Sequence, residues 1–323
     1  MEPVNYAVIG VGNMGRNHVR SLSEMPEARL VAVADANPTL VGQFAKQYQC
    51  QGYTDYQEMI DRDDISCVSV CVPTSMHLEV ASACMRKGKH VLLEKPIAST
   101  VEEGLALQRL AKASDVCLMV GHIERFNPAV QKVKELLQKG EIGRVVSIMA
   151  RRVGVFPPQI KDANIAVDLA IHDLDIVNYL LDALPLEVTF DKRRNHIEHR
   201  EDSVEFFLRY PNAAAYIQAN WITPVKIRKL NITGTDGYLE MDYINQKIQF
   251  YKSNYEKYKE VPGQIDGFSD YVLKYMEPDL VEISVAKREP LKEEIRYFIQ
   301  AVNENIQVDS DFAIHALEIA LRS

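Results

Sequence analysis

The sequence has 323 residues, more than one hydrophobic core usually organises, so two domains are expected. Hydrophobic residues make up 47% and charged residues 25%, which is ordinary globular composition. A net charge of −8 argues against nucleic acid or an anionic membrane as the main partner. We find no signal-peptide pattern and no apolar run near the roughly 18 residues of a membrane helix, so a cytoplasmic protein is expected.

Short apolar runs alternate with helical stretches through the first 121 residues. The runs predicted to be strands are Tyr6–Gly10, Leu30–Ala34, Cys67–Val72, His90–Leu93 and Cys117–Val120. The segments predicted to be helices between them are Met14–Met25, Pro38–Tyr48, Ser75–Lys87 and Thr100–Ala113. This alternation predicts an α/β domain over residues 1–121, with a parallel, doubly wound sheet whose strands are buried on both faces.

The pattern changes after Gly121. Helices are predicted at Pro128–Lys139, Asp168–Leu181, Glu289–Asn303 and Asp311–Arg322. Strands are predicted at Val145–Arg152, Glu187–Phe190, Ser203–Arg209, Ala213–Trp221, Arg228–Thr233, Tyr238–Met241 and Lys247–Tyr251. Because several of these strands follow one another without a helix, we expect an α+β domain over residues 122–323 with a mostly antiparallel, open sheet.

The first loop carries a complete G-x-G-x-x-G motif, in the residues Gly10, Val11, Gly12, Asn13, Met14 and Gly15. The motif follows the first strand and opens the first helix, which is the context of a dinucleotide-binding loop. Gly10 would permit the tight turn, Gly12 would let backbone approach the pyrophosphate, and Gly15 would let the helix pack on the strand. The alternative is a glycine turn with no ligand.

Asp35 indicates which dinucleotide is bound. It lies twenty residues after Gly15 and directly after the second predicted strand. A carboxylate there accepts hydrogen bonds from the adenosine ribose and repels a 2′-phosphate, so NAD is favoured over NADP. The alternative is a carboxylate that only caps the turn before Asn37 and Pro38.

Lys95 lies in the motif Glu94-Lys95-Pro96, directly after the predicted strand His90–Leu93. Strand ends in such sheets face the cofactor crevice, which would place this lysine beside a bound nicotinamide. A lysine tuned towards neutrality there can take the proton of an alcohol during hydride transfer. The peptide before Pro96 is of the kind most able to be cis. An ordinary surface lysine is the alternative.

Asp168 and His172 are four residues apart in a predicted helix, so they share one face, and Asp175 extends that stripe. A carboxylate beside a histidine orients the ring and suits proton transfer. Two alternatives remain: Asp168 complements the helix N-terminus while His172 packs, or the pair binds a metal. No second histidine stands at ligand spacing and the five cysteines form no Cys-x-x-Cys pair, so no metal is predicted.

Four motifs follow one another in an order and spacing that resembles the glucose–fructose oxidoreductase/inositol dehydrogenase/MocA (Gfo/Idh/MocA) family. They are the glycine motif, Cys71-Val72-Pro73-Thr74-Ser75-Met76-His77, Glu94-Lys95-Pro96 and Asp168-x-x-x-His172. The resemblance covers essentially the whole chain. It implies a Rossmann domain followed by a mostly antiparallel open sheet, whose outer face commonly mediates oligomerisation.

The resemblance also implies roles for individual residues. Lys95 would contact both the nicotinamide ribose and the substrate, and Asp168 with His172 would form the substrate-domain pair, with His172 the proton acceptor. The remaining residues placed at the cofactor by this resemblance are Pro73, Thr74, His77, Glu94 and His122.

A finer resemblance points to the branch of UDP-N-acetylglucosamine 3-dehydrogenases. It rests on the segments 121–128, 168–175 and 221–243. Such enzymes oxidise the sugar C3 hydroxyl, usually ahead of an aminotransferase, so a nucleotide-sugar substrate and a downstream aminotransferase are expected. The basic residues that would meet a diphosphate are Arg151, Arg152, Lys226 and Arg228, with Arg152 and Arg228 as the predicted contacts. Solvated charges on strand faces are the alternative.

Three other functions stay open at this point: a dehydrogenase of inositol or a free sugar, an NAD-dependent glycosidase on the same fold, and a cofactor-binding regulator. The presence of both Lys95 and His172 disfavours the regulator. A homo-oligomer, dimer or tetramer, is also expected. In the run Ala213–Trp221, apolar residues alternate with polar ones, so one face must be covered by helices or a partner sheet.

Overall fold

The computed structural model describes residues 2–156, 164–253 and 279–323, which divide into two compact units. The first unit comprises Met1–Phe126 and Arg288–Arg322, and the second comprises Asn127–Lys287 with Ser323. The N-terminal boundary lies close to the predicted one, but the last two helices belong to the first unit rather than to the second. Among the described residues, no helix is both long and apolar enough to cross a membrane.

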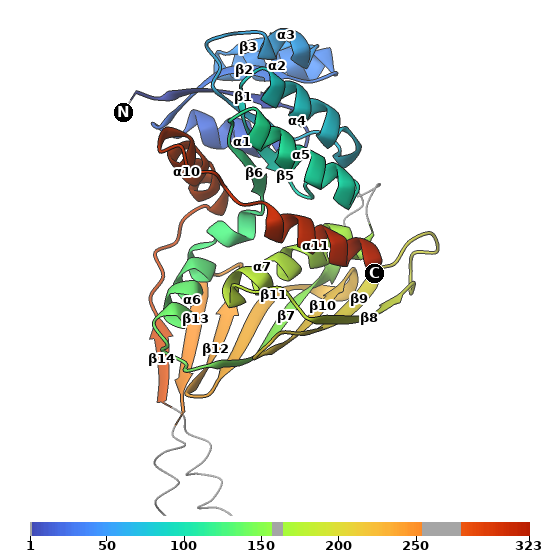
Figure 1. The fold of residues 1–323 in the computed structure, drawn as a ribbon, viewed down its shortest axis with the longest axis vertical. Helices are drawn as coiled ribbons and strands as arrows, with labels where there is room; N and C mark the ends of the chain where they lie inside the picture. Colours follow the sequence, from blue (N-terminus) through green and yellow to red (C-terminus); the bar gives the residue numbers. More distant parts are fainter. Residues whose placement is uncertain (1, 157–163, 254–278) are drawn as a thin grey trace, which may run out of the picture. The chain divides into compact units, whose positions relative to one another are not determined.

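The first unit is built on a six-stranded sheet (Figure 1). Its strands are β1 Val4–Ile9, β2 Ala28–Ala34, β3 Gln51–Tyr53, β4 Cys67–Val70, β5 His90–Glu94 and β6 Leu118–Gly121. All of their pairings are parallel and the order is β3-β2-β1-β4-β5-β6. This is the order of a doubly wound dinucleotide-binding sheet, which reverses direction between β1 and β4. The predicted Rossmann fold is therefore confirmed.

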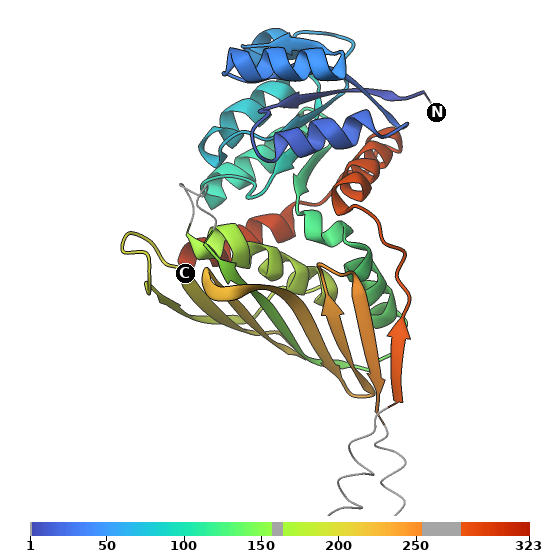
Figure 2. The same ribbon diagram turned by 180° about the vertical axis from the view of Figure 1, so that it is seen from behind.

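Helices cover both faces of this sheet. They are α1 Gly15–Ser23, α2 Pro38–Tyr48, α3 Tyr56–Ile60, the short η1 Thr74–Met76, α4 His77–Arg86, α5 Val101–Ala113 and η2 Ile123–Phe126. Local chemistry fixes their starts: the Asn37 side chain accepts from the Thr39 amide at the start of α2, and Thr100 accepts from the Glu103 amide at the start of α5. Figure 1 shows α4 and α5 in front of the sheet, and Figure 2 shows α1 on the opposite side.

The C-terminal helices α10 Pro290–Asn303 and α11 Asp311–Arg322 complete the first unit. Ile295 and Phe298 of α10 are fully buried in the core cluster that contains Tyr6, and the rings of Tyr6 and Phe298 meet edge to face at 6.1 Å. From the sequence alone, these helices were predicted to belong to the second domain. Amphipathic periodicity shows that one face of a helix is buried, but it does not show which unit buries that face.

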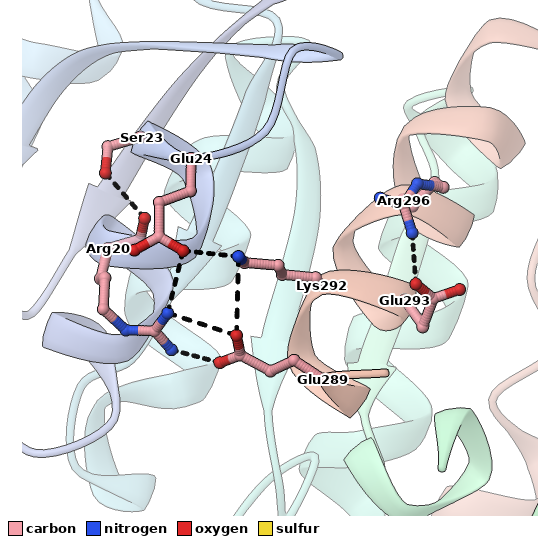
Figure 3. A network of polar contacts seen from close by, with 7 residues as sticks. All are labelled: Arg20, Ser23, Glu24, Glu289, Lys292, Glu293 and Arg296. Atoms are coloured by element: carbon pink, nitrogen blue, oxygen red, sulfur yellow. Dashed lines mark hydrogen bonds and ion pairs between the residues drawn. The ribbon is translucent and has the colours of Figure 1, made fainter. Parts of the chain in front are cut away.

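Ion pairs line the outer side of the contact between α1 and α10 (Figure 3). Arg20 of α1 binds both Glu24 and Glu289, and Lys292 of α10 binds Glu24 at 2.5 Å. Each of these side chains is at least a quarter exposed, so water screens them and the network contributes modestly. The apolar contact beneath it holds α10 in place.

The second unit contains an eight-stranded sheet in the order β14-β13-β12-β11-β7-β10-β9-β8. Its strands are β7 Val145–Val155, β8 Glu187–Arg193, β9 Ser203–Arg209, β10 Ala214–Asn220, β11 Ile222–Gly234, β12 Gly237–Asp242, β13 Lys247–Lys252 and β14 Asp279–Ile283. Only β7 and β10 pair in parallel among the strands described, so the predicted mostly antiparallel sheet is confirmed. Within the described residues, its helices are α6 Pro128–Gln138, the π-helical turn η3 Ala166–Ala170 and α7 Ile171–Leu181.

The two faces of this sheet differ. On β10, Ala215, Ile217 and Ala219 are buried, and this strand contacts η3 and α7. The predicted apolar stripe is thus covered by the chain's own helices. On the other face, Tyr216 stands opposite Met149 and Phe207 in the strand register, and these two are 53% and 52% exposed.

Candidate active site

The predicted cofactor residues lie at one edge of the first sheet. Its strands are in register at their carboxyl ends: Ile9 is aligned with Ala34 and Val70, and Glu94 with Gly121. The glycine loop, Asp35, the segment after Cys71, Lys95 and His122 all follow directly after these strand ends. This is the edge at which sheets of this order bind their ligand.

Each glycine of the first loop has a distinct steric reason. Gly10 has φ +84°, and a Cβ on it would lie 2.6 Å from the carbonyl oxygen of Cys71. A Cβ on Gly15 would lie 1.7 Å from the Gly10 carbonyl oxygen, so α1 can approach the loop only without a side chain. These two contacts match the tight turn and the close helix packing that the motif predicts.

Gly12 differs because a Cβ there would meet no described atom within 4 Å. Asn13 and Met14 beside it are exposed, and no side chain of the described residues caps the start of α1. An open backbone at an uncapped helix N-terminus offers N–H groups and a positive dipole end to an anion. The loop therefore fits the pyrophosphate of a dinucleotide.

Asp35 is half-buried at the end of β2, and both of its oxygens accept backbone hydrogen bonds. Oδ2 accepts from the Val11 amide at 2.9 Å, and Oδ1 accepts from the Asn37 amide at 2.9 Å. The carboxylate thus ties the glycine loop to the following turn, as the turn-capping interpretation predicts. Each oxygen retains a lone pair, so this capping and the ribose contact are compatible.

Lys95 is half-buried directly after β5, and its peptide bond to Pro96 is cis. Glu94 is 8% exposed, and its Oε1 lies 2.9 Å from Nε2 of His18 on α1. Burial alone would raise the pKa of Glu94, but the hydrogen bond and charge of His18, together with Lys95, bring it below its usual value. A carboxylate is therefore held next to Lys95.

His77 supports the same segment from the loop after β4. Its ring is 1% exposed, with Nδ1 2.8 Å from the Pro96 carbonyl oxygen and Nε2 3.0 Å from that of Val72. Burial lowers the pKa of His77, so the ring is neutral and has one N–H to donate. Both ring nitrogens of His77 face protein carbonyl oxygens, of which the single N–H can bind one, and its predicted contact with the cofactor stays a prediction.

Pro73, Thr74 and His122 occupy different environments at this edge. Pro73 is exposed and Thr74 half-buried in the turn that precedes α4, so both belong to the accessible part of the loop. His122 follows β6 and is 2% exposed. Their predicted contacts with the cofactor stay predictions.

In the second unit, Asp168 and His172 occupy the start of the helix that was predicted from their spacing. Asp168 lies in the π-helical turn η3 and His172 in the first turn of α7, and both are half-buried. π-helical turns are rare and occur frequently at functional sites. Asp175, by contrast, is 1% exposed and belongs to the interior.

Arg152, predicted to contact a diphosphate, forms a buried ion pair, and the diphosphate contact stays a prediction. It is 4% exposed, and Nε and Nη2 donate to the two oxygens of Asp173 at 2.7 and 3.0 Å. Its guanidinium also lies 4.9 Å from the centre of the Tyr243 ring. Because two donors of its fork bind Asp173, the residue after His172, Arg152 anchors the first turn of α7 to β7.

Of the other basic residues, Arg228 on β11 stands directly opposite Arg152 in the strand register, so these two lie on the same face of the sheet. Arg151 and Lys226 are exposed, and Arg151 points to the opposite face of β7 from Arg152. Arg228 donates through Nη1 to the carbonyl oxygens of Val153 and Ile227, at 2.6 and 2.9 Å. Strand alternation thus separates Arg151 from Arg152, whereas Arg152 and Arg228 are neighbours, and their contact with a diphosphate stays a prediction.

Two family profiles match this chain. Residues 4–122 match an oxidoreductase family with an NAD-binding Rossmann fold, and residues 130–240 match the GFO/IDH/MocA C-terminal domain. The chain belongs to the Gfo/Idh/MocA family of oxidoreductases. Its cofactor is NAD, in agreement with the glycine loop and Asp35.

Several relatives of this Gfo/Idh/MocA oxidoreductase act on sugars or polyols. UDP-N-acetylglucosamine 3-dehydrogenase from Acidithiobacillus ferrooxidans is 28% identical over 91% of this chain and 87% of its own length. A solved structure of that enzyme has a TM-score of 0.85, at 26% identity, covering 100% of this chain and 97% of that one. Inositol 2-dehydrogenase from Rhizobium meliloti is 33% identical over 58% of this chain and 57% of its own length.

Levoglucosan dehydrogenase, solved in complex with NADH and levoglucosan, shares the fold of this oxidoreductase. The TM-score is 0.82 at 23% identity, covering 99% of this chain and 95% of that one.

Two groups in this oxidoreductase escaped sequence reasoning. His18 lies one turn into α1 and contacts Glu94, 76 residues away. Asp173 follows His172 in the sequence, and its carboxylate binds Arg152. The sequence could have indicated His18 because it occupies a helix position that faces the sheet. Its partner could not be predicted, because that depends on how α1 crosses β4 and β5.

Proposed function

We propose that this oxidoreductase is an NAD-dependent dehydrogenase that oxidises a secondary hydroxyl of a sugar, at C3 of UDP-N-acetylglucosamine or a related nucleotide sugar. One observation carries the choice of substrate. The similarity to UDP-N-acetylglucosamine 3-dehydrogenase extends over 91% of this chain, whereas that to inositol 2-dehydrogenase extends over 58%. Substrate selection must reside largely in the second unit, and an alignment of 295 residues necessarily includes most of that unit.

In the proposed reaction the alcohol carbon loses a hydride and the hydroxyl oxygen loses a proton, which leaves a ketone. When bound, NAD supplies the hydride acceptor. The glycine loop and Asp35 bind the cofactor, and Lys95 contacts both the nicotinamide ribose and the substrate. His172 takes the hydroxyl proton, with Asp168 orienting and stabilising the charged ring.

Arg152 acts in this scheme through its ion pair with Asp173. That pair fixes the first turn of α7, on which His172 lies. Arg228 on β11 is the candidate for direct contact with a diphosphate, because it is half-buried and stands opposite Arg152 in the strand register. A guanidinium can bind a phosphate group through two donors of its fork.

A second candidate is a dehydrogenase of inositol or a free sugar. It is favoured by the higher identity, 33%, with inositol 2-dehydrogenase over the shorter alignment. An NAD-dependent glycosidase would return the hydride to the substrate, so net NADH formation at 340 nm separates both dehydrogenases from it.

The assignment of roles is tested with Lys95→Met and His172→Asn. Loss of a general acid–base group typically lowers kcat by about 100-fold or more. We expect that loss in both variants, with NADH binding weakened more for Lys95→Met, since Lys95 lies on the cofactor unit. Ser21→Ala is the control, because this hydroxyl is buried in α1 with no hydrogen-bond partner in the described part of the chain. Near-normal turnover of either variant would contradict its role.

We also propose that the protein is a homo-oligomer that uses the outer face of the second sheet. The exposed Met149 and Phe207, with Tyr216 between them, form an apolar row on that face. A downstream aminotransferase that consumes the 3-keto sugar is the expected metabolic partner.

A further inference from the structure

A row of hydrogen-bonded side chains lies under the carboxyl edge of the first sheet. His18 of α1 is 1% exposed, and its two ring nitrogens lie 3.0 Å from Oγ of Ser69 and 2.9 Å from Oε1 of Glu94. Ser69 Oγ lies 3.0 Å from the hydroxyl of Tyr6, which is fully buried on β1. The row therefore links β1, β4, α1 and β5 through contacts at the lengths of good hydrogen bonds.

The row ends at Lys95. The second oxygen of Glu94, Oε2, accepts from the backbone amide of Lys95 at 3.3 Å. We propose that His18 is a positioning residue for Lys95: by holding Glu94 between α1 and β5, it fixes the carboxylate beside the lysine that the proposed function uses for catalysis. This inference rests on that proposed function for the role of Lys95, but not for the link between His18 and Glu94.

The charges around the row support this arrangement. Burial raises the pKa of Glu294 on α10 well above its usual value and the charge of Glu94 adds to the effect, which favours the protonated form of Glu294. Burial likewise raises the pKa of the Cys71 thiol. Burial thus favours the neutral forms of Glu294, Cys71 and Tyr6, whereas the contacts of Glu94 with His18 and Lys95 favour its anionic form.

The same helix serves the cofactor loop. α1 begins at Gly15, three residues before His18, so the turn that offers its N-terminus to the pyrophosphate also carries the side chain that holds Glu94. On the other side of Lys95, the carbonyl oxygen of Pro96 lies 2.8 Å from Nδ1 of the buried His77. Both neighbours of Lys95 thus contact buried side chains of the first unit, and such contacts help to keep a reacting group in place.

A metal ion is the competing interpretation of this cluster. Ligand atoms of His18, Cys71 and Glu94 lie within 4.8 Å of one another. Both ring nitrogens of His18, however, are already at hydrogen-bond distance from Ser69 and Glu94. We therefore take the cluster as a hydrogen-bonded group, and metal analysis of the purified protein is part of the test.

The test compares His18→Ala, His18→Gln, Glu94→Gln and the double variant His18→Ala/Glu94→Gln, with Ser21→Ala as the control on the buried side of the same helix. Misplacement of a reacting group by about 1 Å can cost about 100-fold in rate. We expect kcat to fall about 10- to 100-fold in His18→Ala, with partial rescue in His18→Gln, whose amide can still donate to Glu94. The KM for NAD should change far less, and the two single effects should not add in the double variant.

Infrared difference spectra give a readout that does not depend on catalysis. Without His18, burial should raise the pKa of Glu94, so a protonated-carboxyl band in addition to that of Glu294 should appear in His18→Ala and be absent from the double variant. Unchanged kcat together with no new band would overturn the inference, and so would stoichiometric zinc that is lost with His18→Ala. If Lys95→Met stays active while the band appears, the proposed role of Lys95 fails and the link between His18 and Glu94 stands.

Discussion

Gly12→Ala should separate cofactor binding from folding. Gly12 does not have a positive φ, and a Cβ there would meet no described atom within 4 Å. At such a position Gly→Ala stabilises a protein by about 0.4–1 kcal/mol, because the unfolded chain loses freedom. The same methyl group would stand where the pyrophosphate must approach the backbone. Loss of one charge-assisted hydrogen bond, about 1.5–3 kcal/mol, corresponds to about 10- to 100-fold weaker NADH binding.

The assay is NADH fluorescence titration beside urea unfolding for Gly12→Ala, Gly15→Ala and Gly42→Ala. A Cβ on Gly42 of α2 would also meet no described atom within 4 Å, so this variant should be stabilised and bind NADH normally. Gly15→Ala would place its Cβ 1.7 Å from the Gly10 carbonyl oxygen and should lose both stability and binding. Normal NADH affinity in Gly12→Ala would refute the assignment of this loop to the pyrophosphate.

Three further predictions concern the cofactor, pH and assembly. Asp35→Asn should weaken NAD binding relative to NADP by about 1–3 kcal/mol in calorimetry. Asn37→Ala, which alters only the cap of α2, should leave this preference unchanged. Equal effects of the two substitutions would mean that Asp35 only caps the turn. The pKa of Glu294 is raised in the folded state, so its contribution to stability is present at low pH and is lost as pH rises above the unfolded value of about 4.3. The urea midpoint should therefore fall more steeply with rising pH in the wild type than in Glu294→Gln. The same pH dependence of the midpoint in both proteins would contradict a raised pKa of Glu294. Met149→Glu with Phe207→Glu should dissociate the oligomer in light scattering, whereas Leu105→Glu on α5 should not; a wild-type monomer at micromolar concentration would disprove the interface.

The cofactor loop could be predicted from the sequence because each of its determinants is local. Gly10, Gly15 and the strand before them specify a turn whose steric requirements the structure repeats. The strand Ser203–Arg209 and the helix Pro38–Tyr48 were predicted to the residue, since periodicity and an Asn-Pro start are also local signals. β3, α3 and β14 were missed because three to five residues carry too little periodicity to stand out.

What escaped prediction depends on contacts distant in sequence. Alternation along β7 shows that Arg151 and Arg152 face opposite ways, but the partner of Arg152, Asp173, lies 21 residues further on. The His18–Glu94 contact spans 76 residues, and α10 joins the unit formed by the beginning of the chain. Such pairings follow from how helices cross a sheet, which single-sequence patterns do not encode.

The most direct test of the proposed function is a comparison of substrates at saturating NAD. Purified protein is given UDP-N-acetylglucosamine, inositol or free glucose, and NADH formation is followed at 340 nm with mass analysis of the product. The proposed function predicts efficient NADH formation from UDP-N-acetylglucosamine, with a keto product two hydrogens lighter. Efficient NADH formation from inositol or glucose, with none from UDP-sugars, would contradict it.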